Sequence, residues 1–292
     1  MGGNIIGIMS PGDMGSAIGK LLSNSGLKVL AYLKDRGELT QLRAKESGIQ
    51  GVNSYDELVG EASLLISVLV PNEATSIAQT IATSIRRTAS HPIYVDCNAI
   101  APRTTENIKH IIEKEGCIFV DAGIIGPPPN EHNSPRIYCS GPDTSKFESL
   151  ADSGLDIRNI GSQIGQASGM KMLYAATTKG AIALWTEVLA ASYALELDDA
   201  LGQELGDSEL LKQMRNHIPT MPRRSKRWVG EMEEIANTLE SLGMTPRILL
   251  GAADVYTKIG ESDLGSLTSR DNNPSLENIF QVLLSPLRTK SL

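Results

Sequence analysis

The sequence predicts an α/β fold: a Rossmann-type doubly wound parallel sheet, then a long connecting helix and an all-α C-terminal domain. Three observations support this. Apolar strand-like runs alternate with amphipathic segments over the first half of the 292 residues. The stretch 166–196 contains no proline, and helical spacing continues after it. We therefore expect a dinucleotide-binding domain over 1–163 and a helical domain over 164–292.

The elements of the predicted sheet domain follow one another in regular order. Fully apolar strands separated by helices favour a parallel sheet covered on both faces, with right-handed crossovers. The expected strands are 4–9, 28–33, 51–52, 63–70, 93–97, 117–121, 136–140 and 156–160. The expected helices are one through Met14 and Leu22, 37–47, one from Tyr55, 73–86 and one from Pro102.

The helical half begins with the longest predicted helix. Residues 166–196 place apolar side chains on nearly every helix face, which indicates packing on several sides and suits a homodimer. A later segment, 226–242, is amphipathic instead. Its apolar residues form a single stripe of Trp228, Met232, Ile235, Leu239 and Leu242.

Composition excludes several classes of function. The net charge is −7, and no long run of Lys and Arg predicts a nucleic-acid partner. No stretch approaches a membrane span or a signal peptide, so we expect a cytoplasmic protein without membrane or nucleic-acid partners. The histidines have no metal-ligand spacing, and we expect no metal. Cys97 and Cys117 lie in apolar runs, where buried inert thiols are expected.

The first strand leads into the glycine-rich stretch "IIGIMSPGDMGS" at 5–16. In the dinucleotide fingerprint G-x-G-x-x-G, Gly12 would let a pyrophosphate approach the backbone, and Gly15 would let the helix pack on the strand. Ser10 stands where the first glycine is usual, and a plain strand-to-turn junction is the structural alternative. The position at the start of a βαβ pattern favours cofactor binding. The predicted contacts are Ser10, Pro11, Gly12, Asp13 and Met14.

The residues after the second strand predict which cofactor is bound. The sequence there is Tyr32-Leu33-Lys34-Asp35-Arg36. A basic residue at this place holds a 2′-phosphate, whereas an acidic one accepts from a ribose hydroxyl. Lys34 and Arg36 favour NADP, while Asp35 keeps NAD as the alternative. A solvated charged turn is the structural alternative.

Five motifs in order resemble the β-hydroxyacid dehydrogenase superfamily, the group of 6-phosphogluconate and 3-hydroxyisobutyrate dehydrogenases. They are "GIMSPGDMG", "SVLVP", "VDCNAIAP", "VDAGIIGPPP" and "GQASGMKMLYAATTKG", and together they span 7–180. The segment "RRSKRWVGEMEEIANTLESLG" at 223–243 is similar to a branch with a distinct 6-phosphogluconate-dehydrogenase-like C-terminal domain.

The resemblance implies hydride transfer between a nicotinamide and a 3-hydroxy acid or related hydroxy or keto compound. Its catalytic lysine matches Lys171. A lysine in the first turns of a mostly apolar helix at a domain seam would be partly desolvated, which would lower its pKa toward the working pH of a general acid/base. A helix-end lysine with its ammonium in solvent is the structural alternative.

Further site residues follow from the same resemblance. Val70, Pro71 and Asn98 would border the nicotinamide and its ribose. The expected substrate contacts are Asn98, Ile125, Gly126, Tyr174, Thr178 and Trp228. The usual Ser-Gly-Gly carboxylate loop reads Ile125-Gly126-Pro127 here, which favours a bulkier or less anionic substrate. Arg223, Arg224 and Arg227 beside Trp228 could instead furnish a new acid-binding site, or simply form a solvated helix start.

Two other functions are compatible with the residues. Imine reductases resemble this architecture but usually lack the catalytic lysine, so Lys171 argues against that activity. A non-catalytic NADP(H)-binding protein is the second alternative. The departures from the family at Ser10, Ile125, Ala99, where a threonine is common, and Tyr174, where an asparagine is usual, give it weight.

Overall fold

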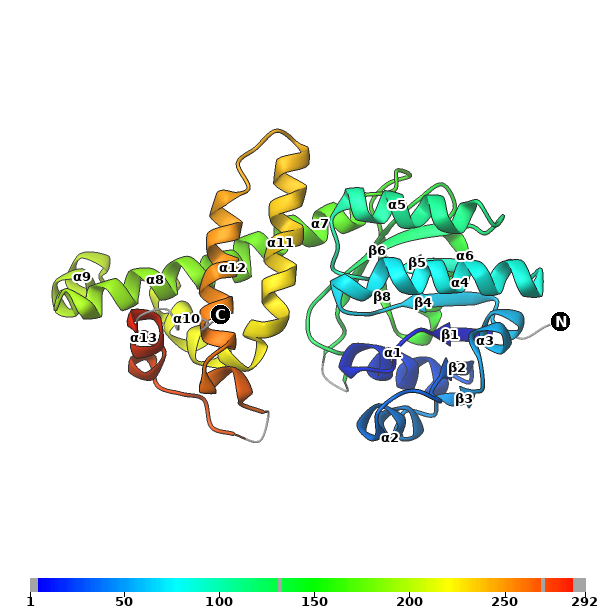
Figure 1. The fold of residues 1–292 in the computed structure, drawn as a ribbon, viewed down its shortest axis with the longest axis horizontal. Coiled ribbons are helices and arrows are strands. Elements are labelled where there is room, and N and C mark those ends of the chain that lie inside the picture. Colours follow the sequence, from blue (N-terminus) through cyan, green and yellow to red (C-terminus); the bar gives the residue numbers. More distant parts are fainter. Residues whose placement is uncertain (1–4, 131–132, 269–270, 286–292) are drawn as a thin grey trace, which may run out of the picture. The chain divides into compact units, whose positions relative to one another are not determined.

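The computed structural model describes residues 5–130, 133–268 and 271–285. The chain divides into two compact units between Met172 and Leu173. The N-terminal unit contains a sheet covered by helices, and the C-terminal unit is helical (Figure 1). The predicted fold class is therefore confirmed. The domain limits 1–163 and 164–292 stay a prediction.

The sheet has eight strands in the order β3-β2-β1-β4-β5-β6-β7-β8. All neighbouring pairs are parallel except β6 and β7, which are antiparallel. The chain builds β1, β2 and β3 in one direction across the sheet. It then crosses back to β4, which pairs with the other side of β1, as in a doubly wound sheet. The strands are β1 Ile5–Ile8, β2 Lys28–Tyr32, β3 Gln50–Val52, β4 Leu64–Ser67, β5 Ile93–Asp96, β6 Phe119–Ile125, β7 Arg136–Ser140 and β8 Asp156–Asn159.

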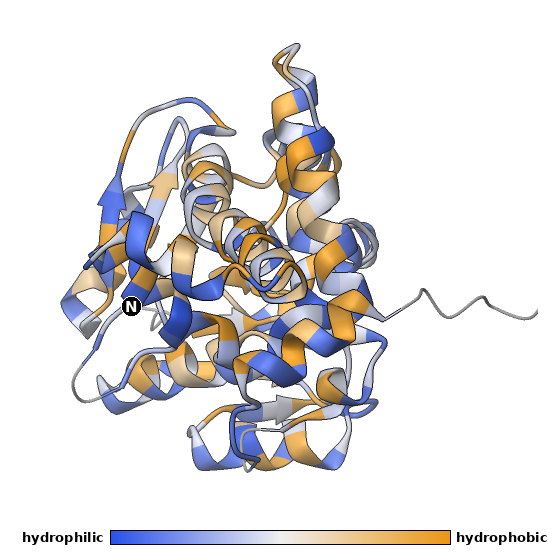
Figure 2. Ribbon diagram, turned by 90° about the vertical axis from the view of Figure 1, so that its left-hand side faces the viewer, coloured by the Kyte–Doolittle hydropathy of each residue, from blue (hydrophilic) through white to orange (hydrophobic). Residues whose placement is uncertain are grey.

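Helices cover both faces of this sheet, because its central strands are apolar on both sides. All residues of β4, β5 and β6 are buried. Helices α3, α4 and α5 contribute to one apolar core, while α1, α2 and α6 contribute to the other. Their bounds are α1 Asp13–Asn24, α2 Glu38–Glu46, α3 Tyr55–Glu61, α4 Ala74–Thr88, α5 Pro102–Glu113 and α6 Ser145–Glu148. In Figure 2 the helices carry hydrophilic and hydrophobic segments in alternation, as amphipathic helices do.

Two predicted strands differ from the observed ones by more than one residue at an end. The prediction of a strand over 63–70 is too long, since β4 ends at Ser67. The prediction of 117–121 is too short, since β6 continues to Ile125. This extension has a tertiary cause: Ile125 pairs with Arg136 of β7. An antiparallel partner satisfies backbone groups in a stretch that would otherwise leave the sheet.

The C-terminal unit contains six helices within its described residues, besides the end of α7. Helical backbone continues from Gln166 to Ala194, as predicted to within two residues, but it contains a π-helical segment, η3, at Ala176–Gly180. The helices are α7 Gln166–Ala175, α8 Ala181–Ala194, α9 Asp198–Leu205, α10 Glu209–His217, α11 Ser225–Ser241, α12 Arg247–Gly260 and α13 Leu276–Leu284.

Helix α11 agrees with the predicted apolar stripe only in part. Trp228, Met232 and Ile235 are buried, and Leu239 is half-buried. Leu242 is 68% exposed, so its assignment to the stripe is wrong. It lies beyond the last residue of α11, where the chain leaves the helical path.

The structure also shows the state of the cysteines and whether any described helix could span a membrane. Cys97, Cys117 and Cys139 are free and buried. Burial raises the pKa of the Cys117 thiol to about 11 and that of Cys139 to about 12, so both thiols stay protonated, as inert core cysteines do. Within the described part of the chain, no helix has the length and apolarity needed to cross a membrane.

Candidate functional site

The glycine-rich turn joins β1 to the N-terminus of α1. Gly12 is the N-cap of α1, with φ −70° and ψ −164°, and no side chain caps this end of the helix. The first N–H groups of a helix have no acceptor within the helix. A Cβ placed on Gly12 would meet no heavy atom within 4 Å, so the space beside the turn is open. This arrangement suits a phosphate group.

Gly15 is required by the packing of α1 against the turn. A Cβ at this position would lie 2.1 Å from the carbonyl oxygen of Ser10 and 3.3 Å from Cγ2 of Ile8. The missing first glycine therefore does not prevent the turn, because Ser10 contributes only its backbone to this contact. The other predicted contacts border the same turn. Pro11 is buried, Met14 is half-buried, and the exposed Asp13 pairs with Arg43.

Two basic residues follow β2, and one of them, Arg36, contacts the backbone just before this turn. Lys34 is exposed, and Nη2 of Arg36 donates to the carbonyl oxygen of Met9 at 3.3 Å. The intervening acid is already engaged, since the Tyr32 hydroxyl donates to Oδ2 of Asp35. That bond raises the pKa of Tyr32. Both basic and acidic side chains therefore follow β2, and the preference for a 2′-phosphate or a free ribose hydroxyl stays a prediction.

Asn98 connects the carboxyl ends of β4 and β5. Its Oδ1 accepts from the backbone N–H of Leu69 at 2.6 Å, and its Nδ2 donates to Oγ of Ser67 at 2.9 Å. The side chain is buried, so it acts by holding the segment that follows β4. The next two residues are the predicted nicotinamide contacts: Val70 is 47% exposed and Pro71 is half-buried.

Asp96, the last residue of β5, holds the backbone of Asn98 by a hydrogen bond. Its Oδ1 accepts from the backbone N–H of Asn98 at 2.9 Å, while Oδ2 has no hydrogen-bond partner among the described residues. Burial, with a smaller contribution from the charge of Asp121, raises the pKa of Asp96 to about 7. This carboxyl group therefore titrates near neutral pH.

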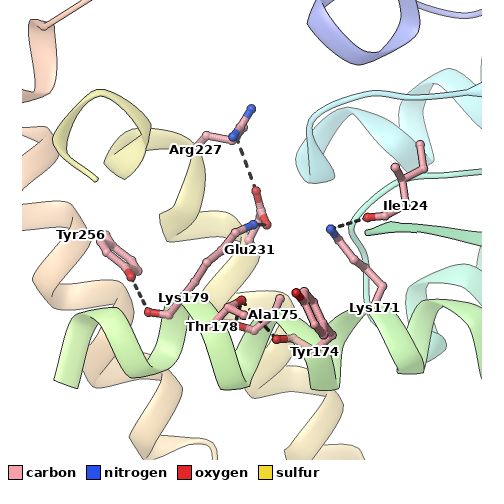
Figure 3. A network of polar contacts seen from close by, with 9 residues as sticks. All are labelled: Ile124, Lys171, Tyr174, Ala175, Thr178, Lys179, Arg227, Glu231 and Tyr256. Carbon is pink, nitrogen blue, oxygen red and sulfur yellow. Dashed lines mark hydrogen bonds and ion pairs between the residues drawn. The ribbon is translucent and has the colours of Figure 1, made fainter. Parts of the chain in front are cut away.

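Lys171 lies on α7, and its Nζ donates to the carbonyl oxygen of Ile124 at 2.6 Å (Figure 3). That carbonyl lies near the end of β6. Gly123 makes the approach possible, since a Cβ there would lie 2.7 Å from the carbonyl oxygen of Ala167 and 2.9 Å from Cβ of Lys171. The lysine ammonium is thus fixed against the strand rather than free in solvent.

A buried carboxylate fixes the start of the same helix. Asp121 Oδ2 accepts from the backbone N–H groups of Gly165, Ala167 and Ser168 at 2.8, 3.1 and 3.1 Å. The hydroxyls of Ser140 and Ser168 also donate to it, at 3.1 and 3.2 Å. Burial raises the pKa of Asp121, and these bonds oppose that shift. Asp121 joins β6 to the first turn of α7, one turn before Lys171.

The predicted substrate residues have different surroundings in their own units. Ile125 is buried as the last residue of β6, and Gly126 is exposed with φ +130°. Tyr174 is 40% exposed, and its carbonyl oxygen accepts from the hydroxyl of Thr178 at 3.2 Å. Trp228 is buried in the C-terminal unit. Their roles toward a substrate stay predictions.

Sequence reasoning missed Asp121, Gly123 and Lys179. Lys179 lies in the π-helical segment and forms a buried ion pair with Glu231 (Figure 3). "VDAG" at 120–123 was noted as a motif, but its aspartate and glycine act through residues more than forty positions later. Within the described residues, no group of three or more His, Cys, Asp or Glu side chains could hold a metal ion.

Two family models match the chain. One, described as the NAD binding domain of 6-phosphogluconate dehydrogenase, matches residues 5–153, just over half of the 292 residues. The other, a domain of unknown function called DUF1932, matches residues 192–259. The first match covers strands β1 to β7 of the sheet and ends before β8, and the second lies within the helical unit.

Several known proteins are similar over most of the length. An uncharacterized 28.5 kDa protein of Methanothermus fervidus is 28% identical over 88% of this chain and 99% of that protein. The conserved protein MTH1747, described as structurally similar to 3-hydroxyacid dehydrogenases, is 27% identical, with a TM-score of 0.68, over 87% of this chain and 97% of its own.

Two enzymes share the fold at lower identity. The 3-hydroxyisobutyrate dehydrogenase of Mycobacterium tuberculosis is 16% identical, with a TM-score of 0.73, over 97% of this chain and 99% of its own. A Streptomyces aurantiacus imine reductase is 15% identical, with a TM-score of 0.56, over 96% of this chain and 100% of its own.

Proposed function

This chain belongs to the family of the NAD binding domain of 6-phosphogluconate dehydrogenase, and we propose that it is an NADP-dependent oxidoreductase. Its substrate is a 3-hydroxy acid or a related hydroxy or keto compound. The observation that carries this proposal is the position of Lys171, whose ammonium is held at the end of β6 beside the carbonyl of Ile124. The similarity to proteins described as resembling 3-hydroxyacid dehydrogenases supports the same reaction class.

Lys171 is the general acid/base of the proposed reaction. In reduction, its ammonium donates a proton to the substrate oxygen as the carbonyl becomes a hydroxyl; in oxidation, the neutral amine takes that proton back. The nicotinamide supplies or receives the hydride. The carbonyl of Ile124 orients the ammonium, and Asp121 keeps α7 in register with β6.

NADP is the proposed cofactor, with NAD as the alternative. The open turn at Gly12 would hold the pyrophosphate, and Lys34 and Arg36 would hold the 2′-phosphate. The Tyr32 hydroxyl donates to Oδ2 of Asp35 and competes with a ribose hydroxyl for that oxygen, which supports this preference. Val70 and Pro71, positioned through Asn98, would border the nicotinamide.

We also propose a homodimer. Helix α8 exposes an apolar stripe, including Leu184 at 61% and Val188 at 39% exposure. Since these residues lie four positions apart, they share a helix face. A second copy of the chain would cover this face. We place the protein in the cytoplasm, where free buried thiols such as Cys97 persist.

Cofactor binding and chemistry are tested separately. Titration of NADPH and NADH fluorescence with the protein measures binding, and Lys34→Ala with Arg36→Ala should weaken NADPH by about tenfold or more while sparing NADH. No binding of either nucleotide would refute the proposal.

Turnover is then measured on 3-hydroxy acids, keto acids and cyclic imines. Lys171→Ala should lose at least about 100-fold in kcat while NADPH affinity is retained. Lys212→Ala, a surface lysine of α10, is the matched control. Full activity of Lys171→Ala would refute its role. Turnover of imines alone would identify an imine reductase, and binding without turnover would favour a sensor.

A further inference from the structure

The arginines at and just before the start of α11, Arg223, Arg224 and Arg227, have different surroundings. Nη2 of Arg223 donates to the carbonyl oxygen of Asp271 and to Oδ1 of Asn273, at 3.2 and 2.6 Å. Arg223 thus ties two segments of the C-terminal unit together. Arg224 and Arg227 do not share this role: both are exposed, and both lie close enough to Lys179 for their charges to act on it.

Lys179 is a buried cation whose carboxylate partner is shared. Its side chain is 17% exposed, and Nζ pairs with Oε2 of Glu231, which is 7% exposed. The other carboxylate oxygen of Glu231 lies 3.5 Å from Nε of Arg227. Burial lowers the pKa of Lys179, Glu231 opposes that shift, and the two arginines reinforce it. The Glu231 carboxylate therefore lies in a group with three cations, Lys179, Arg224 and Arg227.

Arg224 lies among the same positive charges. Partial burial lowers the pKa of this guanidinium, and the charges of Arg227 and Arg223 lower it further. Among the four side chains Lys179, Arg224, Arg227 and Glu231, three positive charges stand against one negative charge, in a chain whose net charge is −7. Partly buried charge of one sign is costly unless an opposite charge compensates it.

The local backbone holds the cluster in place. Lys179 lies in the π-helical segment, a conformation that is rare and frequent at functional sites. Its carbonyl oxygen accepts from the hydroxyl of Tyr256 on α12 (Figure 3). Its ammonium lies 5.3 Å from the centre of the Trp228 ring, which supplies an apolar wall. Lys179 is thus held by α12 through its carbonyl oxygen and by α11 through its ammonium.

We propose that Lys179, Arg224 and Arg227 form a binding site for the acid group, carboxylate or phosphate, of a small molecule. All three side chains are donors without acceptor atoms, and a guanidinium matches both acid groups with two parallel hydrogen bonds. Glu231 positions Lys179 and Arg227, and the bound anion supplies the missing negative charge. This site goes beyond the proposed oxidoreductase reaction and does not depend on it.

Calorimetry and thermal unfolding of the full chain test the site with inorganic phosphate and with malonate, against potassium chloride of equal ionic strength. Phosphate or malonate should bind at a single site and raise Tm above the value in potassium chloride. Comparison of the two probes distinguishes a phosphate site from a carboxylate site. Equal effects of phosphate, malonate and chloride would overturn the proposal, because they would mean charge screening only.

Variants locate the anion. Arg224→Ala and Arg227→Ala should each weaken binding by about tenfold or more, as loss of a charge-assisted hydrogen bond does. Lys226→Ala is the matched control, since it removes an exposed cation between them. The pair Lys179→Met with Glu231→Gln removes both buried charges together and should abolish binding. Unchanged affinity in Arg224→Ala, or an equal loss in Lys226→Ala, would overturn the assignment.

A spectroscopic signal separates binding at this site from binding elsewhere. The chain has two tryptophans, so Trp185→Phe leaves Trp228 as the only indole. Its fluorescence should change with anion concentration at the calorimetric affinity, because the ring lies against Lys179. A calorimetric signal without a fluorescence change would place the anion elsewhere and overturn the proposal. NADPH titration is unaffected by either result.

Discussion

The strongest structural prediction concerns the carboxylate that fixes the start of α7. Asp121→Ala removes the acceptor of the backbone N–H groups of Gly165, Ala167 and Ser168. Ala167 keeps a second acceptor, Oγ of Ser140, at 3.0 Å. Of these backbone donors, those of the half-buried Gly165 and the buried Ser168 are left without an acceptor, and each unsatisfied donor costs about 2 kcal/mol.

The net loss is smaller than the sum of these terms. Two orphaned donors cost about 4 kcal/mol, whereas removing a carboxylate that is costly to bury returns part of this, about 1 kcal/mol. We expect Asp121→Ala to lose about 3 kcal/mol of unfolding free energy, and Asp121→Asn about 1–2 kcal/mol, because the amide keeps one acceptor oxygen. Asp143→Ala is the control, since Asp143 accepts from Ser145 N–H at an exposed site.

Hydrogen exchange measures the loss where it occurs. The amides of Gly165, Ala167 and Ser168 should exchange faster in Asp121→Asn, while amides of β1 and α1 keep their protection. Turnover should fall as the start of α7 loses its attachment to β6, because Lys171 follows one turn later. NADPH affinity should be retained. Equal stability losses in Asp121→Ala and Asp143→Ala, with unchanged exchange in α7, would refute the reasoning.

Three further predictions concern the turn, pH and assembly. Gly15→Ala should cost about 3 kcal/mol of stability, because its Cβ would lie 2.1 Å from a backbone oxygen. Gly12→Ala should leave Tm unchanged yet weaken NADPH; equal Tm losses would contradict this. The folded pKa of Asp96, about 7, lies above the ordinary value of 3.8, so its stabilising contribution is present below 3.8 and is lost as the pH rises through 7. Urea unfolding of Asp96→Asn should lack this slope of about 1.4 kcal/mol per pH unit; an unchanged slope would assign it to another group. Leu184→Glu with Val188→Glu should give a monomer by light scattering; a dimer of that variant would exclude α8 from the interface.

The sheet was predictable because its signals are local in the sequence. The strands 28–33 and 136–140 differ from β2 and β7 by at most one residue, since apolar runs bounded by turn residues are visible directly. The length of β6 was not predictable in this way. It depends on pairing between Ile125 and Arg136, across a loop whose return path carries no periodic signal.

The same distinction applies to the candidate site. The turn at Gly12 and Gly15 was found because its residues are neighbours in the sequence. Asp121 was missed because its partners lie 44 to 47 positions away. An aspartate in an apolar strand pattern gives no indication of whether it caps a helix, pairs with a cation or binds a ligand.

Lys171 and Lys179 show which site residues can be predicted from the sequence and which cannot. Lys171 was identified through motif resemblance, and its contact with Ile124 is consistent with an ammonium held at the end of the sheet. Lys179 follows eight residues later in the same motif, and helical spacing alone gave it no role. What distinguishes it is a carboxylate 52 positions away and a π-helical segment, and neither is encoded locally. The buried ammonium of Lys179 pairs with a carboxylate that also lies near Arg227, and this crowding of charges becomes visible only when tertiary structure brings the side chains together.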